Sequence, residues 1–131
     1  MNTLLSIVSI GFGATVGASS RYYIGIISTQ YLGKGLPYGT LISNVIGSFI
    51  AGVLIVLVLE KLLLSETYRL MLLVGLAGSL TTMSALSIES VEMLSGGHYS
   101  QALINILLNL LLSLAAAILG VVASKYVFNL V

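Results

Sequence analysis

The sequence predicts an all-α membrane protein of four transmembrane helices, on the basis of its composition and of the spacing of its apolar stretches. Of the 131 residues, 58% are hydrophobic and 7% are charged, and the mean hydropathy is +1.14. A soluble domain carries about 25% charged residues, which cover its surface. Apolar stretches of roughly 20 residues occur four times, and each is long enough to cross a ~30 Å hydrocarbon core.

The four predicted spans cover residues 4–28, 38–59, 70–94 and 102–127. Turn-forming and charged residues fill the short connectors between them. Short connectors favour consecutive helices as antiparallel neighbours, and an even number of spans places both termini on one side. No connector is long enough to separate domains, so residues 1–131 are expected to form a single four-helix transmembrane domain. The expected location is the cell (plasma) membrane, as a multi-pass protein.

Several function classes are excluded by what the chain contains. It has no cysteine and one histidine, so neither a thiolate metal site nor a His-rich one is expected. No Ser/His/Asp constellation supports an enzyme. The basic residues are too scattered to form a nucleic-acid surface. They are Arg21, Lys34, Lys61, Arg69 and Lys125.

The positive charges give a weak topological signal. Lys61, Arg69 and Lys125 fall on the side of the termini, whereas Lys34 and Arg21 fall on the other. Cytoplasmic loops are normally enriched in Lys and Arg. Three against two leaves two interpretations: a single weakly biased orientation, or insertion both ways, which permits an antiparallel dimer.

Polar residues in the first two spans each have two possible roles. Gly13 and Gly17 have the spacing that lets helix backbones approach closely. Arg21 lies about six residues from the predicted end of its span, and is either an interfacial anchor or a cation at a vestibule. Asn44 lies among apolar residues, so it either bonds to another helix or faces water.

The third span contains five hydroxyl residues and two glycines between positions 75 and 87. Glycine destabilises helices, and hydroxyl groups compete for backbone hydrogen bonds. We therefore expect a break near residues 78–82, whose freed carbonyls are suited to a cation. The alternative is a hydroxyl-rich packing face. Glu89 and Glu92 fall near the end of this span, where their carboxylates are expected to reach water.

Asn105, Asn109 and Ser113 are spaced at i, i+4 and i+8 in the fourth span, so they share one face of a helix. Uncharged hydrogen-bond donors in a file suit a small, partly dehydrated anion. An interhelical hydrogen-bond seam has the same spacing, and the stripe alone does not separate the two. No acidic, histidine or lysine residue lies at the centre of a span, which argues against a proton relay.

Three sequence blocks resemble the Fluc (CrcB) fluoride channel family. Residues 13–22 resemble its GGxxGAxxRY pattern, with Ala14 in place of the second glycine. Residues 37–49 match PxGTLxxNxxGSF completely. Residues 75–82 resemble GxxGGLTT, with Ser79 in place of a glycine. The order and spacing of these blocks along nearly the whole chain make a chance similarity improbable.

The resemblance implies a fluoride-specific ion channel built as an antiparallel, dual-topology dimer of four-helix subunits. Such a channel passively exports fluoride from the cytoplasm along two pathways at the subunit interface. A structural sodium ion, which is not transported, would be held by the backbone carbonyls of Gly78 and Thr81. Arg21 would lie at the vestibule. The pathway positions implied by the resemblance are Asn44, Met83, Ser84, Leu86, Asn105, Asn109 and Ser113.

The chain departs from the family at the two aromatic positions of the third span. The family reads TTFSTFS, whereas residues 81–87 here place Met83 and Leu86 where the phenylalanines stand. Neither side chain has the electropositive ring edge that faces an anion. We expect a heterodimer in which a second four-helix subunit supplies the phenylalanines; a tolerant homodimer and poor conduction by this chain alone stay open.

Two further hypotheses about function stay open. One is a small dual-topology proton-coupled exporter, which shares the size and the balanced charges but requires a titratable carboxylate within a span. The other is a non-conducting partner subunit or membrane scaffold, in which the polar stripe only holds helices together. Membrane lipid surrounds the chain in every case, and no nucleic-acid partner is expected.

Overall fold

The computed structural model describes residues 2–59 and 64–128, and every regular element in these two ranges is a helix. Four helical stretches are long and apolar enough to cross a membrane: Thr3–Leu32, Tyr38–Leu59, Glu66–Ser95 and Tyr99–Val127. They confirm the four predicted spans. Lys61, which entered the charge count, lies outside the described residues.

The first two spans are the continuous helices α1 (Thr3–Leu32) and α2 (Tyr38–Leu59). Asn2 caps α1 by accepting a 3.1 Å hydrogen bond from the Leu4 N–H. The helix runs four residues beyond the predicted end at position 28, because the first residue unsuited to it is Gly33, which has a positive φ of 78°.

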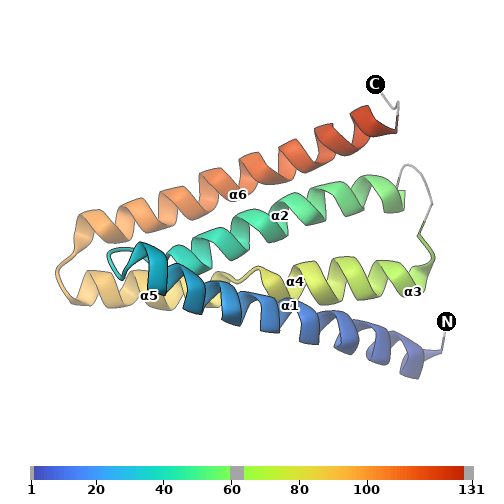
Figure 1. The fold of residues 1–131 in the computed structure, drawn as a ribbon, viewed down its shortest axis with the longest axis horizontal. Coiled ribbons are helices and arrows are strands. Elements are labelled where there is room, and N and C mark those ends of the chain that lie inside the picture. The colour runs from blue at the N-terminus through green and yellow to red at the C-terminus, as the bar shows by residue number, and fades with distance from the viewer. Residues whose placement is uncertain (1, 60–63, 129–131) are drawn as a thin grey trace.

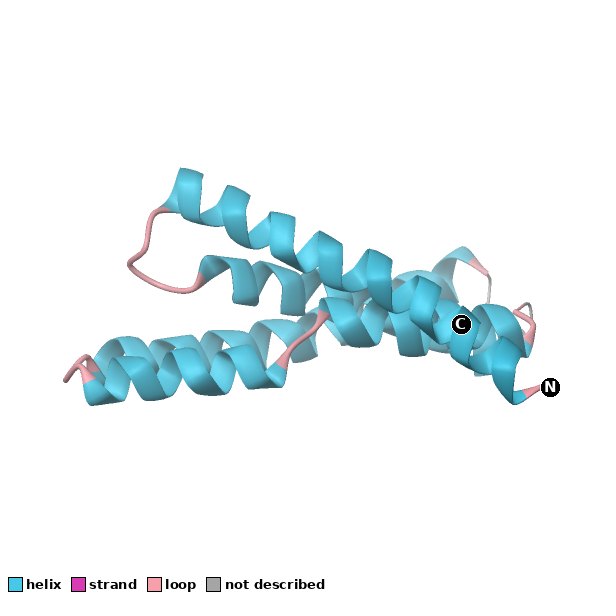
Figure 2. Cartoon of the chain, turned by 90° about the horizontal axis from the view of Figure 1, so that it is seen from below, coloured by secondary structure: helices cyan, strands magenta, loops and turns pink. Residues whose placement is uncertain are grey.

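The third span consists of four elements, α3 (Glu66–Arg69), η1 (Leu70–Ala77), α4 (Gly78–Leu80) and α5 (Met83–Ser95). It begins four residues before the predicted start. The segment η1 is a π-helix, a wide helix that apolar periodicity does not predict. Between α4 and α5 the backbone is extended, with ψ of 153° at Thr81 and 121° at Thr82. Figure 2 shows this short non-helical segment in the middle of the bundle.

The helices pack mainly between spans that are not consecutive (Figure 1). The last helix, α6 (Tyr99–Val127), packs most extensively on α2, and α1 packs on η1 and α4. The ends of α1 and α6, at Thr3 and Val127, lie at one end of the bundle. The expected contacts between consecutive spans are also present, but they are less extensive than these two pairings.

Two glycines explain the close pairing of α2 with α6. A Cβ atom on Gly52 would collide with the carbonyl oxygen of Ala117, and one on Gly120 would collide with that of Phe49. The two backbones therefore touch, as in the small-residue interfaces of membrane helices. Because both contacts lie on the half of α2 beyond Asn44, they fix α6 against that half.

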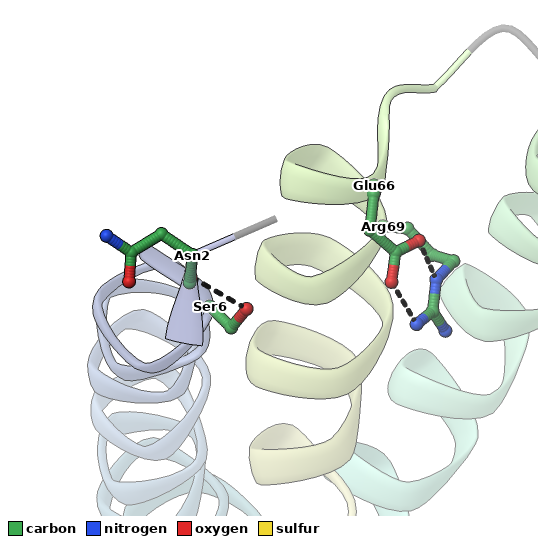
Figure 3. A network of polar contacts seen from close by, with 4 residues as sticks. All are labelled: Asn2, Ser6, Glu66 and Arg69. Carbon is green, nitrogen blue, oxygen red and sulfur yellow. Dashed lines mark hydrogen bonds and ion pairs between the residues drawn. The ribbon is translucent and has the colours of Figure 1, made fainter. Parts of the chain in front are cut away.

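Two local polar contacts lie at the end of the bundle where α1 begins, one in the first turn of α1 and one in α3 (Figure 3). The Asn2 backbone carbonyl accepts a hydrogen bond of 3.4 Å from the Ser6 hydroxyl. In α3, the Arg69 guanidinium donates two 2.7 Å hydrogen bonds to the carboxylate of Glu66, three residues earlier. Both side chains reach solvent, which screens their charges, so this ion pair contributes little to stability.

Candidate functional site

The non-helical segment of the third span is held by Asn44 of α2. In a continuous α-helix the Thr82 N–H would bond to the Gly78 carbonyl. Here that N–H donates to Asn44 Oδ1 at 2.6 Å, and the Asn44 amide donates to the Thr82 carbonyl at 3.2 Å. Asn44 therefore replaces the helical partner of the Thr82 backbone, and it does so while only 7% exposed.

A second helical bond is replaced one turn later. The Ala85 N–H, whose regular partner is the Thr81 carbonyl, donates instead to Thr82 Oγ1 at 3.2 Å, so that Thr82 caps α5. The carbonyls of Gly78 and Thr81 thus both lose their helical donors. Among the described residues, no other backbone N–H is recorded as bonding to either. These two oxygens belong to the residues for which the sequence predicted a cation.

The Asn44 amide also starts a chain of hydrogen bonds that joins three helices. It donates to Asn109 Oδ1 at 2.8 Å, and the Asn109 amide donates to the Asn105 carbonyl and Oδ1 at 3.0 Å. The Asn105 amide then donates to Ser90 Oγ of α5 at 3.2 Å. Asn109 and Asn105 are only 2% and 3% exposed. The polar face of α6 therefore bonds across helices at these two positions.

A groove of about 760 Å³ lies where α2, α6 and the third span meet. Its polar lining includes amide, hydroxyl and freed backbone groups, and its apolar lining comes from α6, at Ile106, Leu110 and Leu114, and equally from the third span. Helix α1 contributes none of the lining residues. The predicted site residues in the lining are Asn44, Gly78, Thr81, Met83, Leu86, Asn109 and Ser113.

Three predicted site residues are not part of the groove lining. Asn105 is joined to it only through Asn109. Ser84 is exposed on α5 and shares a 3.1 Å hydrogen bond with Thr82. Arg21 is half-buried on α1, eleven residues before the end of that helix, or about 16 Å. The greater length of α1 therefore places Arg21 farther from the helix end than the sequence predicted.

The two missing phenylalanine positions have different surroundings. Met83 is 73% exposed at the groove, whereas Leu86 is 7% exposed and packs inside the subunit. None of the described residues that line the groove is aromatic. Any ring that faces an ion in this groove therefore has to come from a residue that does not line it within the single subunit.

Two polar residues that the sequence analysis did not assign to the site are Thr40 and Glu89. The Thr40 hydroxyl donates a 2.5 Å hydrogen bond to Glu89 Oε1, and Glu89 is half-buried rather than open to water as expected. Thr40 lies four residues before Asn44, a helical spacing that could have revealed it. Glu89 also borders a recess of about 600 Å³ at the loop end of the bundle, with Lys34, Glu92 and His98.

The chain is similar to known proteins over most of its length. The family described as "CrcB-like protein, Camphor Resistance (CrcB)" matches residues 8–121. A fluoride-specific ion channel FluC from Sulfurihydrogenibium sp. (strain YO3AOP1) is 44% identical over 116 residues, which cover 88% of this chain and 94% of that protein. One from Roseiflexus sp. (strain RS-1) is 41% identical with the same coverage. One from Clostridium perfringens (strain 13) is 36% identical over 128 residues, 98% of this chain and all of that protein.

Proposed function

Because this chain belongs to the CrcB family, we propose that it is a subunit of a fluoride-specific ion channel in the cell membrane. The relatives named above carry that activity in their names and align over most of both chains. The observation within the structure that best supports the proposal is the groove, where uncharged hydrogen-bond donors lie beside apolar walls. A passive channel of this kind releases fluoride from the cytoplasm and so lowers its toxicity.

The chemistry of the groove suits a small, strongly hydrated anion. Fluoride loses part of its hydration shell only where hydrogen-bond donors of the protein take the place of water. Ligands in other ion selectivity filters replace the hydration shell of their ion in the same way. The hydroxyl of Ser113 is such a donor, whereas the amide N–H groups of Asn44 and Asn109 bond within the subunit and would have to exchange those partners for the anion. Among the described residues, none bonds to the Ser113 hydroxyl, which is therefore available to an ion in the groove. Apolar neighbours keep the surroundings low in dielectric, which strengthens these bonds.

An antiparallel dimer supplies what the single subunit lacks. The groove is open, and polar lining residues that are not buried, among them Ser48 and Ser113, would otherwise face lipid, which satisfies no hydrogen bonds. A second four-helix subunit placed over the groove encloses a pathway. In the antiparallel dimer, this subunit in turn covers the groove of its partner, which encloses a second pathway. The nearly balanced Lys and Arg count is compatible with the dual topology that this dimer requires.

We assign the break in the third helix to a structural sodium ion at the centre of this dimer. The Gly78 and Thr81 carbonyls, freed of their helical donors, are oxygen ligands of the kind that unwound transporter helices offer to Na⁺. Two such carbonyls from each subunit would hold the ion, which stays in place while fluoride passes. The ion would keep the extended Thr81 and Thr82 backbone in register between the two subunits.

The partner subunit is proposed to be a different chain of the same family. Met83 and Leu86 both line the groove without an aromatic ring, Met83 at an exposed position and Leu86 at a buried one. A partner with both phenylalanines supplies ring edges that face the anion. The homodimer, in which methionine and leucine line the pathway, is the alternative that the experiment below separates.

Fluoride efflux from liposomes tests the proposal. The chain is reconstituted alone and together with a family member that carries both phenylalanines, and efflux of fluoride and of chloride is recorded with an ion-selective electrode. We expect fast fluoride efflux from the mixed vesicles, slower efflux from the chain alone, and no chloride efflux. A proton-coupled exporter would instead respond to an imposed pH gradient. Absence of fluoride efflux in both preparations would refute the channel function.

A further inference from the structure

Helix α1 and the wide helix η1 touch through their backbones, with glycine on both sides. A Cβ atom on Gly13 would collide with the carbonyl oxygen of Met71, and one on Gly17 would collide with that of Leu76. From the other side, a Cβ atom on Gly75 would lie 2.6 Å from the carbonyl oxygen of Ile10. No side chain separates the two helices at these three points, so the path of η1 is tied to that of α1.

The same contact surface reaches the residues that lead into the extended segment. A Cβ atom on Gly17 would lie 3.0 Å from the Leu80 backbone nitrogen, and one on Gly47 of α2 would lie 3.4 Å from Leu80 Cγ. Leu80 is therefore enclosed by α1 and α2 at positions without side chains. It directly precedes Thr81, so any displacement of Leu80 moves the Thr81 carbonyl with it.

The π-helical form of η1 sets the rotation about the helix axis with which the third span reaches Gly78. A π-helix bonds residue i to residue i+5 and so holds more residues per turn than an α-helix. At its end, the Gly78 N–H bonds to the Leu73 carbonyl, five residues earlier. Nothing in the residues of η1 favours this rare form, since they are ordinary helix formers apart from Gly75. The backbone contact with α1 is the feature that accounts for it.

We propose that Gly13, Gly17 and Gly75 are positioning residues, which hold η1 as a π-helix and thereby set Gly78 and Thr81 at the positions needed for sodium binding. This inference rests on the sodium site of the proposed function. It assigns to the α1 contact a role beyond holding the subunit together. Changes in groups that support metal ligands typically lower metal affinity by about 10- to 100-fold, and we expect the same of these glycines.

Sodium-dependent melting of the purified channel assembly in detergent tests the inference without relying on fluoride flux. A ligand that binds only the native protein raises its melting temperature with concentration. Gly17→Ala places a methyl group against the η1 backbone, whereas Gly11→Ala, the matched control on the same helix, meets nothing within 4 Å. We expect Gly17→Ala to need about 10- to 100-fold more sodium for the same stabilisation, and Gly11→Ala to behave as the wild type.

A deletion variant covers the case in which Gly17→Ala does not assemble. Val74 is 43% exposed on η1, and its removal lets the segment wind as an α-helix without adding an atom to the α1 contact. The control Val74→Ala keeps the residue count. We expect the deletion, but not the substitution, to weaken the sodium response at least tenfold, with choline as the inert cation.

The outcomes separate this inference from the proposed function. A wild-type assembly without any sodium response would refute the sodium site and this inference with it, whereas channel activity is judged by fluoride efflux alone. A wild-type response that both variants reproduce would overturn the positioning role only. If neither variant assembles at saturating sodium while both controls do, the contact serves folding alone, and the inference is wrong.

Discussion

Replacing Asn44 with alanine tests whether its side chain competes with the Gly78 carbonyl for the Thr82 N–H. In the structure this N–H bonds to Asn44 Oδ1, which leaves the Gly78 carbonyl free. Without the side chain, the Thr82 N–H has lost its partner and regains one if the third span closes into a continuous helix, where it bonds to the Gly78 carbonyl. We expect Asn44→Ala to lose both the sodium response and fluoride efflux.

The expected loss of stability follows from the bonds that are removed. Asn44 makes three hydrogen bonds, at 2.6, 2.8 and 3.2 Å, with Thr82 and Asn109. At roughly 0.5–1.5 kcal/mol each, they contribute about 1.5–4.5 kcal/mol. Interhelical bonds measured in membranes average about 0.6 kcal/mol, which places the result near 2 kcal/mol. Repairing the helix at Gly78 recovers part of this amount, so the variant should still assemble.

The assay combines melting in detergent with efflux from liposomes. Melting is recorded across a sodium series for the wild type, for Asn44→Ala and for Ser48→Ala. Ser48 lines the same groove one turn farther along α2 and has no recorded hydrogen bond to lose, so it serves as the matched control. We expect Ser48→Ala to keep the sodium response, and Asn44→Ala to melt earlier without one.

Two results would refute this reasoning. If Asn44→Ala kept the wild-type sodium response while efflux disappeared, Asn44 would act on the anion pathway only and not on the Thr82 backbone. If the variant melted and conducted like the wild type, the hydrogen bonds of Asn44 would have no measurable role.

Three further predictions concern the groove and its supports. Asn109→Leu should reduce fluoride efflux at least tenfold while the dimer persists in size-exclusion chromatography, because it removes the polar side chain that accepts from Asn44 at the groove; unchanged efflux would make the stripe a packing seam. Met83→Phe combined with Leu86→Phe should raise efflux by the chain alone, as measured in liposomes; a decrease would argue against the aromatic role. Gly120→Ala should lower the melting temperature by a destabilisation of about 1–3 kcal/mol, because its methyl group meets the Phe49 carbonyl.

The four spans could be predicted from the sequence because hydropathy is a local property of each segment. The ends at Leu32 and Glu66 were each misplaced by four residues, because no strong helix-stopping residue precedes Gly33 and because α3 carries charges that resemble a loop. The π-helical form of η1 was not predictable. It depends on which helix faces Gly75, and a single sequence does not reveal that.

The candidate site could be predicted only where polarity conflicts with the apolar surroundings. Asn44 and Asn109 were found in this way, and the structure joins them by a hydrogen bond. Their roles in conduction stay predictions. The Thr40 bond to Glu89 was missed, because the position of Glu89 near a span end suggested exposure to water, while the neighbouring helix that buries it is distant in sequence.

The spacing of the Asn44 partners along the chain has a consequence for biosynthesis. Thr82 follows Asn44 by 38 residues and Asn109 follows it by 65. At about 5–20 residues per second, the ribosome needs roughly 3–13 s after Asn44 to produce Asn109. During that interval the amide of Asn44, which is buried in the finished structure, lacks its partner on the fourth span. Insertion machinery that shields this helix until the fourth span emerges would therefore protect the nascent chain from mispairing.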